Sequence, residues 1–140
     1  MVTTHEHKVQ YYESDGMGIT HHSNYIRWFE EARLDLLEAI GYPYEEIERQ
    51  GFGSPVLTAN AIYKASTRFG DTVLITARVT RYNGVRMVLD YEVRNKATDV
   101  LCCTGETSHC FTTLDGHPLQ IRRAWPALHE KLLTTLPDPA

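Results

Sequence analysis

The sequence predicts an α+β fold in which one antiparallel sheet curls around a single long helix. Two observations lead to this fold class: a helical repeat of apolar residues at positions 23–40, and strand-like alternation over most of the chain that follows. An antiparallel sheet with one apolar face has to cover the apolar face of that helix. At 140 residues the chain has the size of one typical domain, so residues 1–140 are expected to form a single unit.

The long helix is the clearest element of the sequence. Apolar residues recur three and four positions apart over residues 23–40, as they do on the buried face of a helix. Ser23 is a candidate N-cap because its hydroxyl can accept a first-turn N–H, and Gly41 followed by Pro43 predicts the end of the helix. Residues 44–50 predict one further helical turn.

Strands are predicted where the apolar period changes from 3.6 to 2. The expected strands cover residues 7–12, 57–65, 72–79, 85–94 and 100–113. Asn83-Gly84 predicts an antiparallel hairpin, because both residues tolerate the positive φ that a two-residue turn requires. Gly105 is a candidate bulge. A short helix is expected after Pro126, ending before Pro137.

Charge and composition exclude several classes of function. A net charge of -4 gives no overall basic field, so nucleic acid is not an expected partner. The first residues lack the pattern of a signal peptide, and no stretch approaches 18 apolar residues, so we expect a cytoplasmic protein with no membrane span. Cys102, Cys103 and Cys110 show neither CxxC spacing nor a cysteine-histidine cluster. They are predicted to be buried free thiols, and no metal or cofactor is predicted.

A motif with chemical meaning lies in residues 12–33. It reads YESDGMGITHHSNY at residues 12–25, followed by FEEAR at residues 29–33. An acidic residue, a spacer, an aspartate and a glycine thus precede an asparagine, a tyrosine and a helix that carries Glu-x-Ala-Arg. This segment resembles the hotdog-fold acyl-CoA thioesterases related to 4-hydroxybenzoyl-CoA thioesterase and to the Tol-Pal-associated thioesterases. The resemblance extends over most of the chain and implies the hotdog fold, with one antiparallel sheet wrapped around a long central helix.

The resemblance also implies roles for particular residues. Asp15 takes the position of the catalytic aspartate, Gly18 that of the loop glycine, and His22 that of the residue whose backbone N–H polarises the thioester carbonyl. Tyr25 is expected beside the substrate. Such a reaction needs a carboxylate that attacks the carbonyl or activates water, and first-turn helix N–H groups can stabilise the oxygen that becomes negative. Whether Asp15 is nucleophile or general base stays open.

Two further substrate contacts are predicted on the strands. Asn60 lies on the strand face opposite Ala59 and Ala61, and its amide is a candidate to reach the substrate or a nucleophilic water. The alternative is an amide satisfied within the sheet. Arg86 is the first choice for the phosphates of coenzyme A, because guanidinium groups match phosphate geometry. The alternative is an ordinary surface arginine.

The expected function is hydrolysis of acyl-CoA thioesters to a free acid and coenzyme A, without a cofactor. The resemblance implies a homodimer or homotetramer with active sites between subunits, which would also cover free sheet edges. One alternative is a hydratase or dehydratase acting on enoyl or 3-hydroxyacyl thioesters, which would need a paired acid and histidine. Another is a non-catalytic acyl-binding protein. Within the thioesterase hypothesis, Glu30 and Glu31 are the alternative carboxylates.

Overall fold

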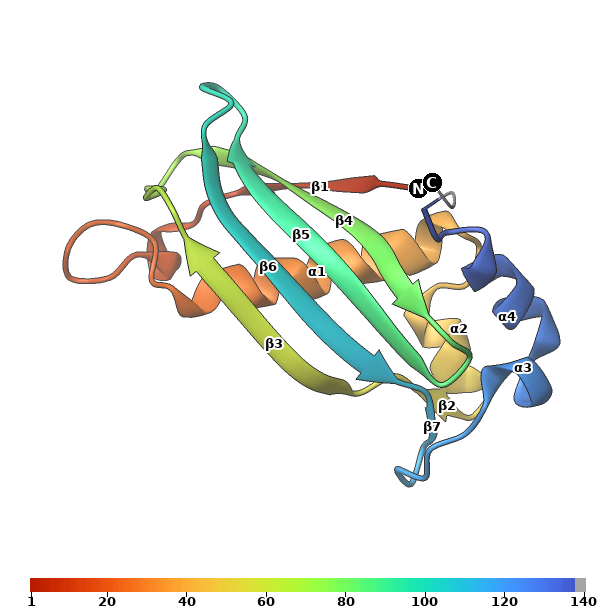
Figure 1. The fold of residues 1–140 in the computed structure, drawn as a ribbon. Coiled ribbons are helices and arrows are strands. Elements are labelled where there is room, and N and C mark those ends of the chain that lie inside the picture. Colours follow the sequence, from red (N-terminus) through yellow and green to blue (C-terminus); the bar gives the residue numbers. More distant parts are fainter. Residues whose placement is uncertain (138–140) are drawn as a thin grey trace.

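A long helix lies against the inner face of a curved antiparallel sheet in the computed structural model, which describes residues 1–137 (Figure 1). The helix, α1, covers Ser23–Ala39, and the sheet has the strand order β1-β4-β5-β6-β3. The strands are β1 (Thr3–Lys8), β3 (Val56–Tyr63), β4 (Thr72–Tyr82), β5 (Arg86–Asn95) and β6 (Leu101–Cys110). The predicted α+β class and the sheet wrapped around one helix are both confirmed.

The smaller elements lie mostly at the end of the sheet that is remote from the start of α1 (Figure 1). They are the 3-10 turn η1 (Tyr11–Glu13), α2 (Tyr44–Arg49), α3 (Ile121–Ala124), α4 (Pro126–Leu133) and the two-stranded pair of β2 (Phe52–Gly53) with β7 (Thr112–Thr113). The helical turns predicted after Pro43 and Pro126 are confirmed. Among residues 1–137, no helix is long and apolar enough to span a membrane.

Helix α1 ends as predicted but is capped differently at its start. Gly41 has φ +91, and its N–H donates to the carbonyl of Glu38 at 2.9 Å, which closes the last turn. The prediction of Ser23 as the N-cap is wrong: the cap position is His22, and Ser23 is already helical. The ring Nδ1 of His21 accepts the Ser23 N–H at 3.2 Å. A histidine ring, rather than the predicted serine hydroxyl, therefore accepts a first-turn N–H.

The central strands alternate as the sequence predicts. Four side chains of β4 and four of β5 are buried against α1, namely Val73, Ile75, Ala77, Val79, Met87, Leu89, Tyr91 and Val93. The Asn83-Gly84 hairpin is confirmed, because Tyr82 pairs with Met87 across the turn. Cys102, Cys103 and Cys110 are buried and free, as expected.

Gly105 does not form the predicted β-bulge. It pairs in register with Tyr91 of β5 and Ala61 of β3. A Cβ atom at this position would overlap the ring of Phe29, which is fully buried on α1. The glycine therefore lets the helix approach the sheet closely at its middle.

The first strand was predicted too late in the chain. Residues 7–12 were expected, but β1 covers Thr3–Lys8 and pairs with β4, while Tyr11 and Tyr12 are exposed in a 3-10 turn. The strand has the sequence TTHEHK and therefore shows no apolar alternation. Its alternate residues Thr3, His5 and His7 are nevertheless half-buried, so polar side chains occupy its inward face.

Strand β3 forms the free edge of the sheet near the candidate motif. It pairs only with β6, and most of its residues are exposed on both faces. Val56, Leu57, Ile62 and Tyr63 are large exposed apolar side chains on this strand. The last long strand was also predicted too long: β6 ends at Cys110, and Phe111 separates it from β7.

Candidate active site

The motif before α1 folds into a tight loop. The N–H of Asp15 donates to the carbonyl of Ile19 at 2.8 Å, and the N–H of Gly18 donates to the carbonyl of Asp15 at 3.0 Å. Gly18 has φ +75, a conformation that side chains with a Cβ adopt only with strain. Asp15 is thereby held at a fixed place beside the start of the helix.

Glu13 anchors the first end of this loop. Its buried carboxylate accepts hydrogen bonds from His7 Nε2 at 2.7 Å, from Trp28 Nε1 at 2.8 Å and from the N–H of Gln10 at 2.8 Å. Burial acts to raise the pKa of Glu13, but these hydrogen bonds outweigh it, so the pKa is lowered. Glu13 is therefore a charged structural anchor that joins β1, the loop and α1.

Thr67 anchors the second end. The N–H of Thr20 donates to the carbonyl of Thr67 at 2.9 Å, and the two threonine hydroxyls lie 2.6 Å apart. The hydroxyl of Tyr25 lies 3.0 Å from the same Thr67 hydroxyl. Burial raises the pKa of Tyr25 to about 12, so this phenol stays neutral and serves to hold the start of α1.

A hollow of about 290 Å³ separates the loop from the end of β3. In Figure 1 the loop and the tip of β3 lie at the same end of the molecule. The residues that line the hollow are Asp15, Ile19, Thr20, His22, Tyr25, Tyr63, Lys64, Ala65 and Ser66. The structure thus brings together three of the residues that the sequence singles out, Asp15, His22 and Tyr25, and Gly18 shapes the same loop.

The carboxylate of Asp15 has one oriented oxygen and one spare oxygen. Its Oδ1 accepts the N–H of Met17 at 2.8 Å. Over the described residues 1–137, Oδ2 receives no hydrogen bond from the protein. A carboxylate that is held by its own loop and keeps one oxygen at the edge of a hollow can act as a nucleophile or as a base.

The start of α1 keeps one backbone donor available. The N–H of Asn24 donates to the carbonyl of His21 at 3.1 Å, and that of Ser23 donates to the His21 ring. The N–H of His22 has no acceptor in the part of the chain that the structure describes. The hydroxyl of Tyr63 donates to the His22 carbonyl, in the next peptide group along the chain, at 3.0 Å. A free N–H at the positive end of a helix can bind a developing oxyanion.

Asn60 and Arg86 are not brought to this hollow within one chain. Asn60 lines a different depression, on the sheet face that points away from α1. Arg86 begins β5 directly after the hairpin turn, whose Gly84 carbonyl accepts the N–H of Ile121 in α3. That turn is at the opposite end of the sheet from the Asp15 loop (Figure 1).

Several residues of the hollow were not predicted from the sequence. Lys64 and Ser66 lie just beyond the end of β3. Nothing in their local pattern marks them, because their position depends on β3 ending beside the start of α1. Lys64 is the cationic side chain of the lining.

A second hollow, of about 130 Å³, lies between α1 and the sheet. Glu30, Arg33 and His109 are among its lining residues. Burial, and then the nearby Arg33 guanidinium, lower the pKa of His109 to about 4. This hollow contains an acid and a histidine together, a pairing that was not visible in the sequence. Glu31, the other alternative carboxylate, does not line either hollow and instead faces β1.

Comparison with known proteins decides the family. A model described as the thioesterase-like superfamily matches residues 9–136. The chain belongs to this superfamily. A Bacillus subtilis (strain 168) relative named "Putative acyl-CoA thioesterase YneP" is 33% identical over 128 residues, which are 91% of this chain and 93% of the relative.

Solved structures agree with this assignment. A DHNA-CoA thioesterase from Staphylococcus aureus superposes with a TM-score of 0.91 at 34% identity, over 95% of this chain and 89% of that one. A hypothetical protein from Aquifex aeolicus superposes with a TM-score of 0.85 at 29% identity, over 93% of this chain and 98% of that one. The resemblance identified from residues 12–33 is confirmed, and the chain is a hotdog-fold thioesterase.

Proposed function

We propose that this thioesterase hydrolyses acyl-CoA thioesters and that Asp15 is its catalytic carboxylate. The observation that carries the proposal is that Asp15 and His22 line one hollow, while one Asp15 carboxylate oxygen and the His22 N–H have no hydrogen-bond partner among residues 1–137. The names of the relatives, an acyl-CoA thioesterase in Bacillus subtilis and a DHNA-CoA thioesterase in Staphylococcus aureus, support a coenzyme A thioester as the substrate.

In the proposed reaction the thioester carbonyl oxygen accepts the His22 N–H while the carbonyl carbon lies next to Asp15. In one route, an Asp15 oxygen attacks the carbon, the C–S bond breaks, and water then hydrolyses the mixed anhydride. In the other route, Asp15 takes a proton from water, and the resulting hydroxide attacks the carbon and breaks the same bond. In both routes the coenzyme A thiolate leaves and is protonated. The N–H stabilises the negative charge that develops on oxygen.

The phosphates of coenzyme A need cations near the mouth of the hollow. Lys64 lines it and is exposed, so within one chain it is the side chain best placed for this contact. Arg86, the choice made from the sequence, would reach a substrate only at the far end of the sheet or in the site of a second subunit. Asn60 likewise requires a second subunit to take part.

A homodimer formed along β3 follows from the same reasoning. This strand leaves one edge unpaired in the chain described here and exposes Val56, Leu57 and Ile62. A free, apolar edge strand is a template for pairing with a second copy. Such pairing would place the partner next to the tip of β3 and thus next to the Asp15 hollow. The homotetramer and the cytoplasmic location stay predictions.

The proposed function is tested by release of free thiol from a panel of acyl-CoA substrates. The panel contains short, long, branched and aromatic acyl groups, and enoyl-CoA hydration is measured in parallel. An aromatic acyl group is included because Tyr25 and Tyr63 line the hollow with their rings 5.2 Å apart. We expect thiol release with at least one acyl-CoA. Hydration without thiol release would instead favour the hollow that contains Glu30 and His109.

A further inference from the structure

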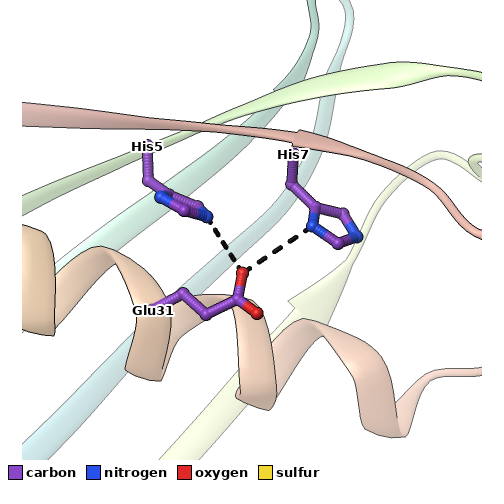
Figure 2. Close-up of side chains that lie close together, drawn as sticks. All are labelled: His5, His7 and Glu31. Atoms are coloured by element: carbon purple, nitrogen blue, oxygen red, sulfur yellow. Dashed lines mark hydrogen bonds and ion pairs between the residues drawn. The ribbon is translucent and has the colours of Figure 1, made fainter.

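Two histidines and a glutamate meet at the sheet edge formed by β1. His5 and His7 are two residues apart on β1, so both side chains point to the same face, and Glu31 reaches them from α1 (Figure 2). One Glu31 oxygen, Oε2, lies 2.9 Å from His5 Nε2 and 3.7 Å from His7 Nδ1. None of these residues lines either hollow described above.

The second nitrogen of each ring already has a carboxylate partner. His5 Nδ1 lies 2.6 Å from Asp35 Oδ2, and His7 Nε2 lies 2.7 Å from Glu13 Oε1. With a metal bound, each neutral imidazole would donate its single N–H to this outer carboxylate. His5 Nε2 and His7 Nδ1 would then keep their lone pairs for a cation shared with Glu31 Oε2.

We propose that His5 Nε2, His7 Nδ1 and Glu31 bind one divalent transition-metal ion, with Zn²⁺ the best match to two imidazoles and a carboxylate. Metal-to-ligand distances of about 2.0 to 2.2 Å in a tetrahedral site separate neighbouring ligand atoms by about 3.3 Å. The two separations to Glu31 Oε2, 2.9 and 3.7 Å, lie on either side of that value. The three ligand atoms all lie within 4.8 Å of one another.

The surroundings fit a metal site better than a simple surface cluster. In metal sites the distal N–H of a ligating histidine usually donates to a carboxylate, which fixes the ring and its tautomer. Asp35 is the carboxylate beside the distal nitrogen of His5, and Glu13 is the carboxylate beside that of His7. The side chains of His5 and His7 are 22% and 15% exposed and that of Glu31 is 46% exposed, so solvent can supply a fourth ligand.

The ion would connect β1 to α1 and would have no step in thioester hydrolysis. Because His7 also contacts Glu13, the ion would rigidify the anchor of the Asp15 loop from outside the hollow. We predicted no metal from the sequence because it shows neither CxxC spacing nor a cysteine-histidine cluster, and Glu31 is 26 residues from His5 in the chain. Only the packing of α1 against β1 brings the three side chains together. The proposal is independent of the substrate of the enzyme.

The test is a titration of the chelator-treated full chain with Co²⁺, followed by visible absorption and by thermal unfolding. We expect one Co²⁺ per chain, the intense visible bands of four-coordinate Co²⁺, displacement of these bands by Zn²⁺ and a raised Tm. His5→Ala and Glu31→Gln should each weaken binding by at least about 100-fold, because losing a ligand costs more than losing an outer-shell partner. Both variants leave the contact between His7 and Glu13 in place.

His117→Ala is the matched control. His117 is another surface histidine beside a carboxylate, with its Nδ1 3.2 Å from Asp115 Oδ2, but within residues 1–137 no third metal-ligating side chain joins this pair. This variant should bind Co²⁺ as the parent chain does. The proposal is overturned if the parent chain shows neither visible bands nor a change in Tm with excess Co²⁺ or Zn²⁺. It is equally overturned if His5→Ala and Glu31→Gln bind with unchanged affinity.

Discussion

Glu13 and Asp15 carry the same charge two residues apart, yet their carboxylates have different surroundings. Glu13 is 4% exposed and receives hydrogen bonds from three donors. Asp15 is half-buried, receives one hydrogen bond from its own loop and borders a hollow. A carboxylate whose oxygens are all engaged holds the loop, whereas chemistry requires an oxygen that is oriented but unoccupied.

The difference arises from the elements that supply the partners. His7 comes from β1 and Trp28 from α1, so Glu13 joins two elements that are distant in the sequence. Among residues 1–137, the Asp15 carboxylate receives a hydrogen bond only from the Met17 N–H, within the same turn. Glu13 is therefore expected to matter for stability and Asp15 for turnover, and each of the following experiments compares the two roles.

The largest effect on stability is expected for Glu13→Gln. The glutamine side chain would place its own N–H₂ donor against at least one of the three donors that now bind Glu13, and that donor would lose its acceptor. We therefore expect the free energy of unfolding to fall by about 3 kcal/mol. Urea unfolding measures this change. Asp15→Asn serves as the control and should change stability by less than about 0.5 kcal/mol. Equal stability of the two variants would remove the structural distinction between these carboxylates.

Lowering the pH should reduce the stability of the fold in two steps, first through His109 and then through Glu13. The pKa of His109 is lowered from 6.5 to about 4, so the unfolded chain takes up a proton first and stability falls as the pH drops through this range. Glu13 has a lowered pKa, so its contribution is complete above 4.5 and is lost as the pH falls through the lower folded value. Denaturant midpoints measured against pH should therefore fall less steeply between 6.5 and 4 for His109→Gln. An unchanged slope would contradict the buried neutral histidine.

A smaller effect is expected from the glycines of the Asp15 loop. Gly16 and Gly18 both have open space where a Cβ would lie, but only Gly18 has a positive φ, of +75. Gly18→Ala should cost about 1 kcal/mol of stability and reduce kcat by displacing Asp15, because of backbone strain alone. Gly16→Ala should do neither, as measured by unfolding and by thiol release. Identical effects of the two variants would show that the geometry of the loop does not depend on Gly18.

The smallest effect concerns substrate binding. Lys64→Ala should raise KM about 5-fold with little change in kcat, because an exposed phosphate contact contributes up to about 1 kcal/mol of uniform binding. Arg86→Ala is the comparison, since Arg86 begins β5, and β5 begins at the other end of the sheet from the Asp15 loop (Figure 1). A larger rise in KM for Arg86→Ala than for Lys64→Ala would mean that a second subunit supplies the phosphate contact.

Local patterns were sufficient to predict α1, the central hairpin and the Asp15 loop. The helix has a strong 3.6-residue repeat and an ending fixed by Gly41, and the strands around Asn83-Gly84 alternate cleanly. The position of Asp15 beside the start of α1 follows from chain connectivity. These features depend on residues that are close together in the sequence.

Features that depend on distant partners could not be predicted. Strand β1 is polar, and only its pairing with β4 makes it a strand. Glu13 lies two residues before Asp15, and its hydrogen-bond partners His7 and Trp28 come from β1 and α1. The far wall of the hollow, with Tyr63, depends on where β3 ends relative to α1. These positions depend on packing between elements that are distant in the chain, and local sequence patterns do not predict that packing.

The most direct measurement of the central claim is kcat for Asp15→Asn beside kcat for Glu30→Gln, with Tm recorded for both. Asp15→Asn should lower kcat at least about 100-fold with an unchanged Tm, since a positioned acid or base contributes about 10² to 10⁴ in rate. Glu30→Gln should stay within a few-fold of the parent chain. If Asp15→Asn keeps near-normal kcat while Glu30→Gln abolishes it, the reaction takes place in the hollow beside His109, and the assignment of Asp15 is wrong.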